Sequence, residues 1–145
     1  MEIRFFIYGA LGWCSEILWT AITRKVTRGA RDWLLVGETS LWAFPLYGLI
    51  AFLYEPLHDA LRAQFVLVRA AVYLAGFWVI EYIGGWLVWK IVGKKPWDYS
   101  KSPGGSLHGL VRWNFVLVWS LVGLGLEPLH DFLVRLTPAI EQALR

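Results

Sequence analysis

Glu55-Pro56-Leu57-His58-Asp59 occurs a second time in this sequence, letter for letter, as residues 127–131. Each copy ends a long apolar run and places a glutamate three residues before a histidine. The repetition extends further, because residues 3–16 align without gaps on residues 68–81. This alignment pairs Arg4, Tyr8, Trp13 and Glu16 with Arg69, Tyr73, Trp78 and Glu81. The chain is therefore predicted to hold two copies of a helical hairpin, repeat 1 at about residues 3–65 and repeat 2 at about residues 66–136.

The composition predicts insertion into a lipid bilayer. Of 145 residues, 57% are hydrophobic and only 17% are charged, which is more apolar surface than a small water-soluble core can cover. The net charge of +3 does not indicate a nucleic-acid partner, because the basic residues flank apolar runs and do not line one face. Cys14 is the only cysteine, so the chain forms no internal disulfide. A single membrane domain over residues 1–145 is expected.

Four apolar runs are long enough to cross about 30 Å of hydrocarbon as helices of about 20 residues. They cover about residues 3–22, 41–61, 66–92 and 110–134. Pro45 and Pro56 interrupt the second run, which is predicted to continue as a kinked helix past His58. The tail from Thr137 is expected to form a short amphipathic helix at most. The predicted fold is an all-α integral membrane bundle of four transmembrane helices, whose two hairpins are related by a pseudo-twofold axis along the membrane normal.

The first span has one face of small and polar residues. Gly9, Gly12 or Trp13, Glu16 and Thr20 recur there at helical spacing. Small residues let another helix approach closely, as membrane interfaces favour. This face is therefore predicted to pack against another part of the protein.

The distribution of basic residues predicts the orientation in the membrane. The segments after the first and third spans, counted as far as Arg112, hold nine of the fourteen Lys and Arg residues. Positive charge favours the cytoplasmic side, so the loops at residues 23–38 and 90–109 are predicted to be cytoplasmic. Four spans enclose little space, and we expect a homo-oligomer or a larger membrane complex.

Four glutamates lie within the apolar runs, one in each: Glu16, Glu55, Glu81 and Glu127. A charged carboxylate facing lipid costs at least about 2.5 kcal/mol, so these side chains are expected to face the bundle interior. We expect Glu16 and Glu81 to form a polar centre whose charge Arg112 balances. Alternatively, Glu16 and Glu81 are neutral or hydrogen-bonded to Arg112, Tyr, Trp or Ser groups. The repeated pentapeptide is then a membrane-exit motif in which proline opens a short interfacial helix.

The same residues also match a metal site. In carboxylate-bridged di-metal bundles, two helices each give one Glu and two others each give Glu-x-x-His, because residues three apart share a helix face. Oxygen and imidazole ligands of this kind suit a divalent metal such as iron, manganese or zinc. Against this interpretation, Pro56 and Pro128 fall inside the two Glu-x-x-His segments. The predicted ligand set is Glu16, Glu55, His58, Glu81, Glu127 and His130.

Several motifs resemble a known family over about residues 5–130. They are Gly12-Trp13-x-x-Glu16, Ser40-Leu41-Trp42-Ala43-x-x-x-Tyr47-Gly48, Glu81 and Pro96-Trp97-Asp98-Tyr99-Ser100. In these motifs the chain is similar to the bacterial CmpB-like ABC-transporter type IV family and to the eukaryotic transmembrane protein 229 family. The resemblance implies a multispan protein of the bacterial cell membrane with a transport role. It supports Glu16, Glu55, Glu81 and Glu127 as matching acidic positions, whereas His58 and His130 depart from the family pattern.

The leading hypothesis is a small transporter-like or permease-like component that handles a cation, a proton or a small polar solute at its acid-lined centre. The Glu/His pairs would guard the outer mouth. In the loop at residues 96–100, Asp98 is expected to bond its own backbone, and the loop is a candidate substrate gate. The alternatives are a di-metal oxidoreductase in the bilayer and a non-catalytic scaffold subunit. The sequence holds no nucleophile with a base and no nucleotide-binding motif, so we assign no catalytic residue and expect a separate ATPase.

Overall fold

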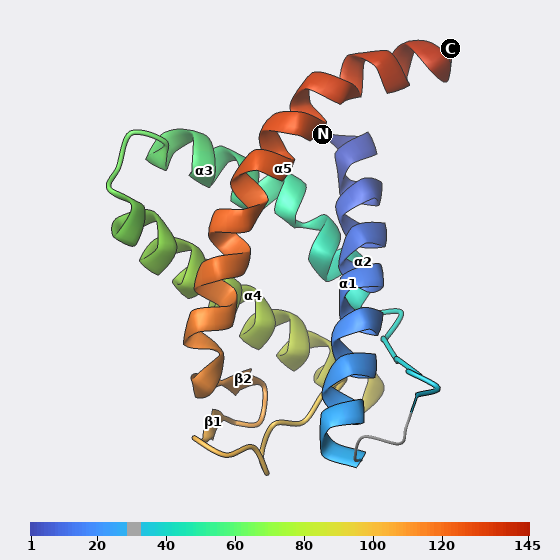
Figure 1. The fold of residues 1–145 in the computed structure, drawn as a ribbon, viewed down its shortest axis with the longest axis vertical. Helices are drawn as coiled ribbons and strands as arrows, with labels where there is room; N and C mark the ends of the chain where they lie inside the picture. Colours follow the sequence, from blue (N-terminus) through green and yellow to red (C-terminus); the bar gives the residue numbers. More distant parts are fainter. Residues whose placement is uncertain (29–32) are drawn as a thin grey trace. The chain divides into compact units, whose positions relative to one another are not determined.

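The computed structural model describes residues 1–28 and 33–145, and within them the chain is mostly helical (Figure 1). Of the loop predicted at 23–38, residues 29–32 lie outside the described residues. The two short strands pair in antiparallel register, with Leu107 opposite Val111. The elements in chain order are α1 (Glu2–Arg28), α2 (Ala43–Gly48), the π-helical turn η1 (Ile50–Tyr54), α3 (Glu55–Leu61), α4 (Val66–Val92), β1 (Ser106–Leu107), β2 (Val111–Arg112), the 3-10 turn η2 (Trp113–Phe115) and α5 (Val116–Ala143).

Three helical segments in the described residues are long and apolar enough to cross a membrane: Glu2–Thr23, Val66–Val92 and Trp113–Ala143. In each, only 17% of the most apolar window is buried inside the protein. Most of the apolar surface of these helices therefore faces outward, which is the arrangement expected of helices that contact lipid.

The second predicted span, residues 41–61, consists of three short elements. Pro56 stands in the first turn of α3 and has no N–H to offer the carbonyl of Phe52, which its ring also crowds. This conflict explains why the turn just before Pro56 is widened into a π-helix. The chain stays helical past His58, as predicted. The run is not one of the three membrane-length helices, so the fourth span remains a prediction.

α4 covers the third predicted span, whereas α5 differs from the fourth. The span expected at 110–134 begins later, at Trp113 in the 3-10 turn, and α5 itself begins at Val116, because residues 106–112 form the β hairpin. The tail is also not a separate short helix, since α5 continues through Pro138 to Ala143. A proline inside a helix bends its axis, and Figure 1 shows α5 changing direction toward its C-terminus.

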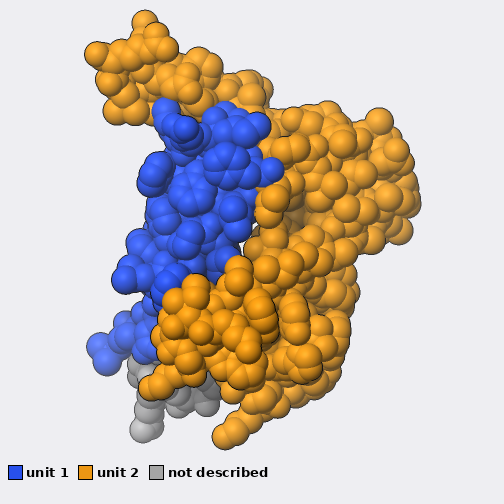
Figure 2. All heavy atoms as spheres, turned by 180° about the vertical axis from the view of Figure 1, so that it is seen from behind, with its two compact units in different colours: residues 1–52 blue, residues 53–145 orange. Residues whose placement is uncertain are grey.

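The chain divides into two compact units, residues 1–52 and 53–145, which Figure 2 colours separately. The two sequence repeats, which divide the chain near residue 65, remain a prediction.

In unit 1, the predicted small-residue face of α1 packs against the segment that contains α2. Phe44 lies on Gly9, and Tyr47 lies on Gly12. A Cβ atom at Gly12 would fall inside the Tyr47 side chain, so only glycine permits this approach. The predicted face is thus confirmed, and it continues through the hydrogen-bonded pairs Trp13–Ser40, Glu16–Thr39 and Thr20–Glu38.

In unit 2, α4 and α5 meet where Tyr73 packs on Gly123. Tyr54, the residue before α3, donates its hydroxyl to the Gly123 carbonyl at 2.5 Å. Because Gly123 has no side chain, Tyr73 of α4 can pack directly on α5. The start of α3 is attached to the same point of α5 through Tyr54. Towards the other end of α4, Trp97 Nε1 donates to the carbonyl of Leu110 at 2.8 Å and ties the loop to the β hairpin.

Replacing Gly12 by alanine is expected to destabilise unit 1, because the new methyl group requires Tyr47 to move. Overpacking of this kind costs about 1–3 kcal/mol. Gly76→Ala is the matched control, since Gly76 is also helical and has open space at its Cβ position. Thermal unfolding in detergent should show a lower midpoint for Gly12→Ala and an equal or higher midpoint for Gly76→Ala. Equal midpoints for the two variants would contradict the packing described.

Candidate functional site

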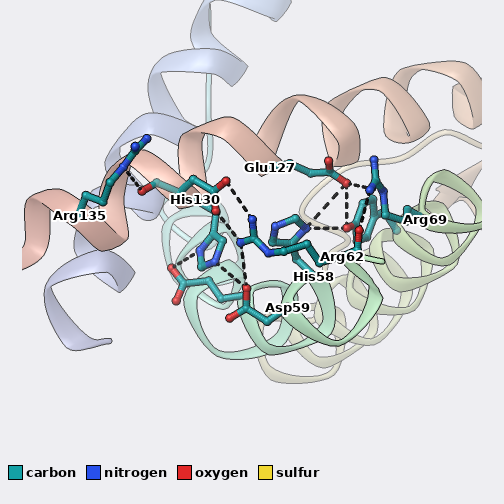
Figure 3. A network of polar contacts seen from close by, with 10 residues as sticks. His58, Asp59, Arg62, Arg69, Glu127, His130 and Arg135 are labelled. Atoms are coloured by element: carbon teal, nitrogen blue, oxygen red, sulfur yellow. Dashed lines mark hydrogen bonds and ion pairs between the residues drawn. The ribbon is translucent and has the colours of Figure 1, made fainter. Parts of the chain in front are cut away.

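The two copies of the repeated pentapeptide meet in unit 2, and their histidines lie side by side (Figure 3). His58 comes from α3 and His130 from α5, with ring centroids 5.2 Å apart and ring planes at 78°. The residues are only 2% and 3% exposed. Two titratable imidazole rings are therefore buried next to each other in a mostly apolar chain.

Each histidine faces the glutamate of the other copy. His58 Nδ1 lies 3.8 Å from Glu127 Oε1, and His130 Nδ1 lies 3.4 Å from Glu55 Oε1. Glutamate and histidine in one copy are three residues apart and occupy the same side of their helix. The two helices thus present matching faces, and the pairing between copies is reciprocal.

Side chains from α4 complete the His58 half of the site. Tyr73 donates its hydroxyl to Glu127 Oε1 at 3.0 Å and lies 2.9 Å from His58 Nδ1. Because the Tyr73 proton goes to Glu127, the tyrosine oxygen accepts from His58 Nδ1–H. His58 then carries its lone pair on Nε2, which is buried and has no hydrogen-bond partner among the described residues. Arg69 Nε lies 3.1 Å from the same Glu127 oxygen.

The rim of the site is a set of exposed charged side chains. Arg62 contacts Asp131 at 2.6 Å and Asp59 at 3.2 Å, so one guanidinium joins the last residues of both copies. Asp59 Oδ1 also lies 3.3 Å from His130 Nε2. Arg135 donates to the backbone carbonyl of Asp131 at 3.0 Å. Polar contacts therefore run without interruption from the exposed Asp59 to the buried His130 and on to Glu55.

Three of these side chains could hold a metal ion. One donor atom each from His58, Asp59 and His130 can be chosen so that all three lie within 4.8 Å of one another. Glu55 and Glu127 stand behind the two histidines as their ion-pair partners. The predicted ligands Glu55, His58, Glu127 and His130 are thus brought together, and Asp59 joins them.

The other two predicted acids have neutral partners elsewhere. Glu81 accepts from Trp119 Nε1 at 3.3 Å and from the Tyr99 side chain. It lies eight residues beyond Tyr73 on α4, about 12 Å along the helix axis, so it does not belong to the Glu/His cluster. Glu16 lies in unit 1, where Thr39 Oγ1 donates to it at 2.7 Å.

Arg112 has a hydrogen bond and an aromatic contact within unit 2. Arg112 Nε donates to Asn114 Oδ1 at 2.5 Å, and its guanidinium lies 4.6 Å from the centre of the Phe115 ring. No ion pair between Arg112 and Glu81 occurs within unit 2. The polar centre of Glu16, Glu81 and Arg112 remains a prediction.

The loop at residues 96–100 forms the predicted turn. The Ser100 backbone amide donates to Asp98 Oδ1 at 2.9 Å and holds the pKa of that carboxyl below its usual value. Tyr99, in the same turn, reaches Glu81. The loop borders a hollow of about 750 Å³ whose aromatic lining includes Trp86 and Trp89.

Reasoning from the sequence missed five members of the site. Two of them, Arg69 and Tyr73, occupy aligned positions in the two repeats, and their spacing of four places them on one face of α4. That shared identity was the available signal. The others are Asp59, Arg62 and Asp131.

One family's sequence model matches residues 3–144, and the family is described as Putative ABC-transporter type IV. No solved structure is significantly similar to this chain.

The pair Arg69–Glu127 is expected to contribute more to stability than the pair Arg62–Asp131. The first pair is 20% and 18% exposed, whereas the second is 50% and 39% exposed and better screened by water. Double-mutant cycles with Arg→Gln and Asp/Glu→Asn/Gln substitutions, read from unfolding by SDS in mild detergent, measure both couplings. We expect about 1–3 kcal/mol for Arg69–Glu127 and less than about 1 kcal/mol for Arg62–Asp131. A larger coupling energy for Arg62–Asp131 than for Arg69–Glu127 would contradict this expectation and show that groups other than Arg69 stabilise Glu127.

Asp98 should remain ionised to a lower pH than a free aspartate. Its folded pKa is lowered, so its contribution to stability is present above the unfolded pKa of about 3.9 and is lost as pH falls through the lower folded pKa. NMR titration of ¹³C-labelled aspartate, assigned with Asp98→Asn, measures this midpoint. Ser100→Ala should keep most of the shift because it retains the backbone amide. A midpoint at or above 3.9 in the wild type would contradict the turn.

Proposed function

The chain belongs to the Putative ABC-transporter type IV family, and from this premise we propose that it is a membrane component of a transport system whose Glu/His cluster binds a cation. The three membrane-length helices fit a membrane protein of this kind. The cation is a proton or a metal ion that is held while a solute or the ion itself crosses the membrane.

The observation that carries this proposal is the reciprocal pairing of two buried histidines with two glutamates. Ionisable groups are costly inside a membrane protein and are mostly found there in pathways for ions or protons. Here they form a continuous series from the exposed Asp59 through His130 to Glu55. A series of this kind would give a cation a path from the surface to a buried binding site.

The positions of the prolines support the same proposal. Pro56 and Pro128 occupy corresponding places in the apolar runs of the two predicted repeats, although α5 continues as one helix through Pro128. In many transporters, interrupted hydrophobic segments at matching positions of two halves mark the binding site. We therefore propose that residues 41–61 cross the membrane as a broken fourth span, that the two hairpins are a duplication, and that homo-oligomers complete the assembly.

Glu16, Glu81 and Arg112 are assigned a structural role in this proposal. Glu16 bonds Thr39, Glu81 bonds Trp119 and Tyr99, and Arg112 lies on Phe115. Each interaction fixes a helix or loop locally. Through Tyr99, the loop at 96–100 is linked to α4, and a gating movement of the loop would act on Glu81 first.

ATP hydrolysis is assigned to a separate subunit. The sequence has no phosphate-binding glycine motif, although the family is of the ABC-transporter type. The partner would face the cytoplasm, where the basic loops at 23–38 and 90–109 are predicted to lie.

Cation flux into vesicles tests this function. Purified protein is reconstituted into liposomes that contain either a pH-sensitive dye or a dye for divalent metals, and a potassium gradient with valinomycin drives uptake. The wild type should admit at least one of these cations faster than empty liposomes, because the buried cluster offers it a binding site. A His58→Gln/His130→Gln variant should lower this flux at least about tenfold, the loss expected from removing about 1.4 kcal/mol of interaction.

Glu141→Gln, a change at an exposed position near the end of α5, is the control and should leave the flux unchanged. Equal flux in the wild type and the double variant would show that the cluster does not take part in transport.

A further inference from the structure

We infer that His58, His130 and Asp59 form a binding site for a single divalent transition-metal ion, with the two glutamates orienting the histidines and not ligating the metal. This inference rests on the proposed function and names the cation that the cluster takes. It differs from the di-metal set of the sequence analysis in ion number, in the added ligand Asp59 and in the absence of all four glutamates from the ligands.

The spacing of the donor atoms fits one ion. Zinc bonds to imidazole nitrogen and carboxylate oxygen are about 2.0–2.2 Å long, which places the donors of a tetrahedral site about 3.4 Å apart. His130 Nε2 and Asp59 Oδ1 are already 3.3 Å apart. One donor atom from each of the three residues lies within 4.8 Å of the other two, so the side chains would rotate toward one another to bind a single ion.

The hydrogen bond at Nδ1 of His58 leaves Nε2 free to act as a metal ligand. Nδ1–H donates to Tyr73, whose own proton goes to Glu127. The lone pair therefore resides on Nε2, which is buried and has no hydrogen-bond partner among the described residues. A buried nitrogen without a partner costs free energy, and a metal ion would satisfy it.

His130 lies against a carboxylate of the other copy, but its Nδ1 has no hydrogen-bond partner among the described residues. Its Nδ1 faces Glu55 Oε1 at 3.4 Å, and its Nε2 faces Asp59. A carboxylate behind a ligating histidine is the usual support of a metal site, because it fixes the tautomer and the ring orientation. The reciprocal pairing thus places one carboxylate near each histidine, in a 3.4 Å contact for His130 and through Tyr73 for His58.

The ligand types select the class of metal. Two imidazoles and one carboxylate suit zinc and its neighbours in the transition series, whereas magnesium and calcium prefer oxygen ligands alone. Three protein ligands leave a fourth position for water or a solute. The carboxylates of the cluster outnumber the guanidinium groups paired with them, so a divalent charge is also favoured electrostatically.

Binding of Co²⁺ to the full-length protein in detergent, after treatment with a chelator, tests the inference. Tetrahedral Co²⁺ absorbs visible light strongly and reports both stoichiometry and geometry. We expect one Co²⁺ per chain with a tetrahedral spectrum in the wild type. Tyr73→Phe should weaken binding by about 10–100-fold, the usual effect of losing an orienting partner.

Asp59→Asn removes a ligand and should weaken binding more than Tyr73→Phe. Asp59 is exposed, so its replacement leaves the buried packing intact, and an unchanged thermal midpoint confirms this for each variant. Glu81→Gln is the matched control, because Glu81 belongs to the di-metal set but lies outside the cluster, and it should bind as the wild type does.

Three results would overturn the inference: no Co²⁺ bound to the wild type, full binding in Asp59→Asn, or two ions per chain that Glu81→Gln reduces. If Co²⁺ does not bind while proton flux still depends on the histidines, the metal site is wrong and the proposed function stands. If Co²⁺ binds as expected while the histidine variant transports normally, the site is right and the proposed function fails.

Discussion

The structure of unit 2 depends on how its buried carboxylates and imidazoles find partners in an apolar chain. A polar group removed from water without a partner costs several kcal/mol, and a charge costs more. Glu55 and His58 point from one side of α3, and Glu127 and His130 point from one side of α5. Because each copy presents the same pair, the two copies complement each other, and the glutamate of one meets the histidine of the other.

Packing around this polar core follows from small and aromatic residues. Gly123 lets Tyr73 approach α5, and its carbonyl also accepts from Tyr54. The close approach places the Tyr73 hydroxyl between Glu127 and His58. The same contact that holds α4 against α5 thus also sets the tautomer of a buried histidine, and packing and site chemistry are linked through one side chain.

The sequence predicted those parts that depend on local pattern. The limits of α4, the small-residue face of α1 and the turn at Asp98 follow from hydropathy, helical spacing and side-chain chemistry, and the structure confirms them. The sequence could not show which acids meet. Four glutamates in four runs look equivalent, but Glu81 lies too far along α4 to join the cluster. It also could not show that Arg62 bridges both copies, since that contact depends on the relative position of α3 and α5.

Family membership and site geometry support the functional account from different directions. The family indicates a membrane protein of ABC-transporter type, and the cluster offers a buried place for a cation. Neither glutamate needs to be a ligand, because each supports the histidine of the other copy. One copy of the pentapeptide then forms one half of the proposed site, and the second copy forms the other half.

The most direct test of this account is to compare couplings between the two copies with couplings inside each copy. Double-mutant cycles in SDS unfolding would use Glu→Gln and His→Gln at Glu55, His58, Glu127 and His130. The account predicts couplings of about 0.5–3 kcal/mol for Glu55 with His130 and for Glu127 with His58, and additivity within about 0.5 kcal/mol for the pairs inside each copy. Larger couplings inside each copy than between the copies would contradict the reciprocal site.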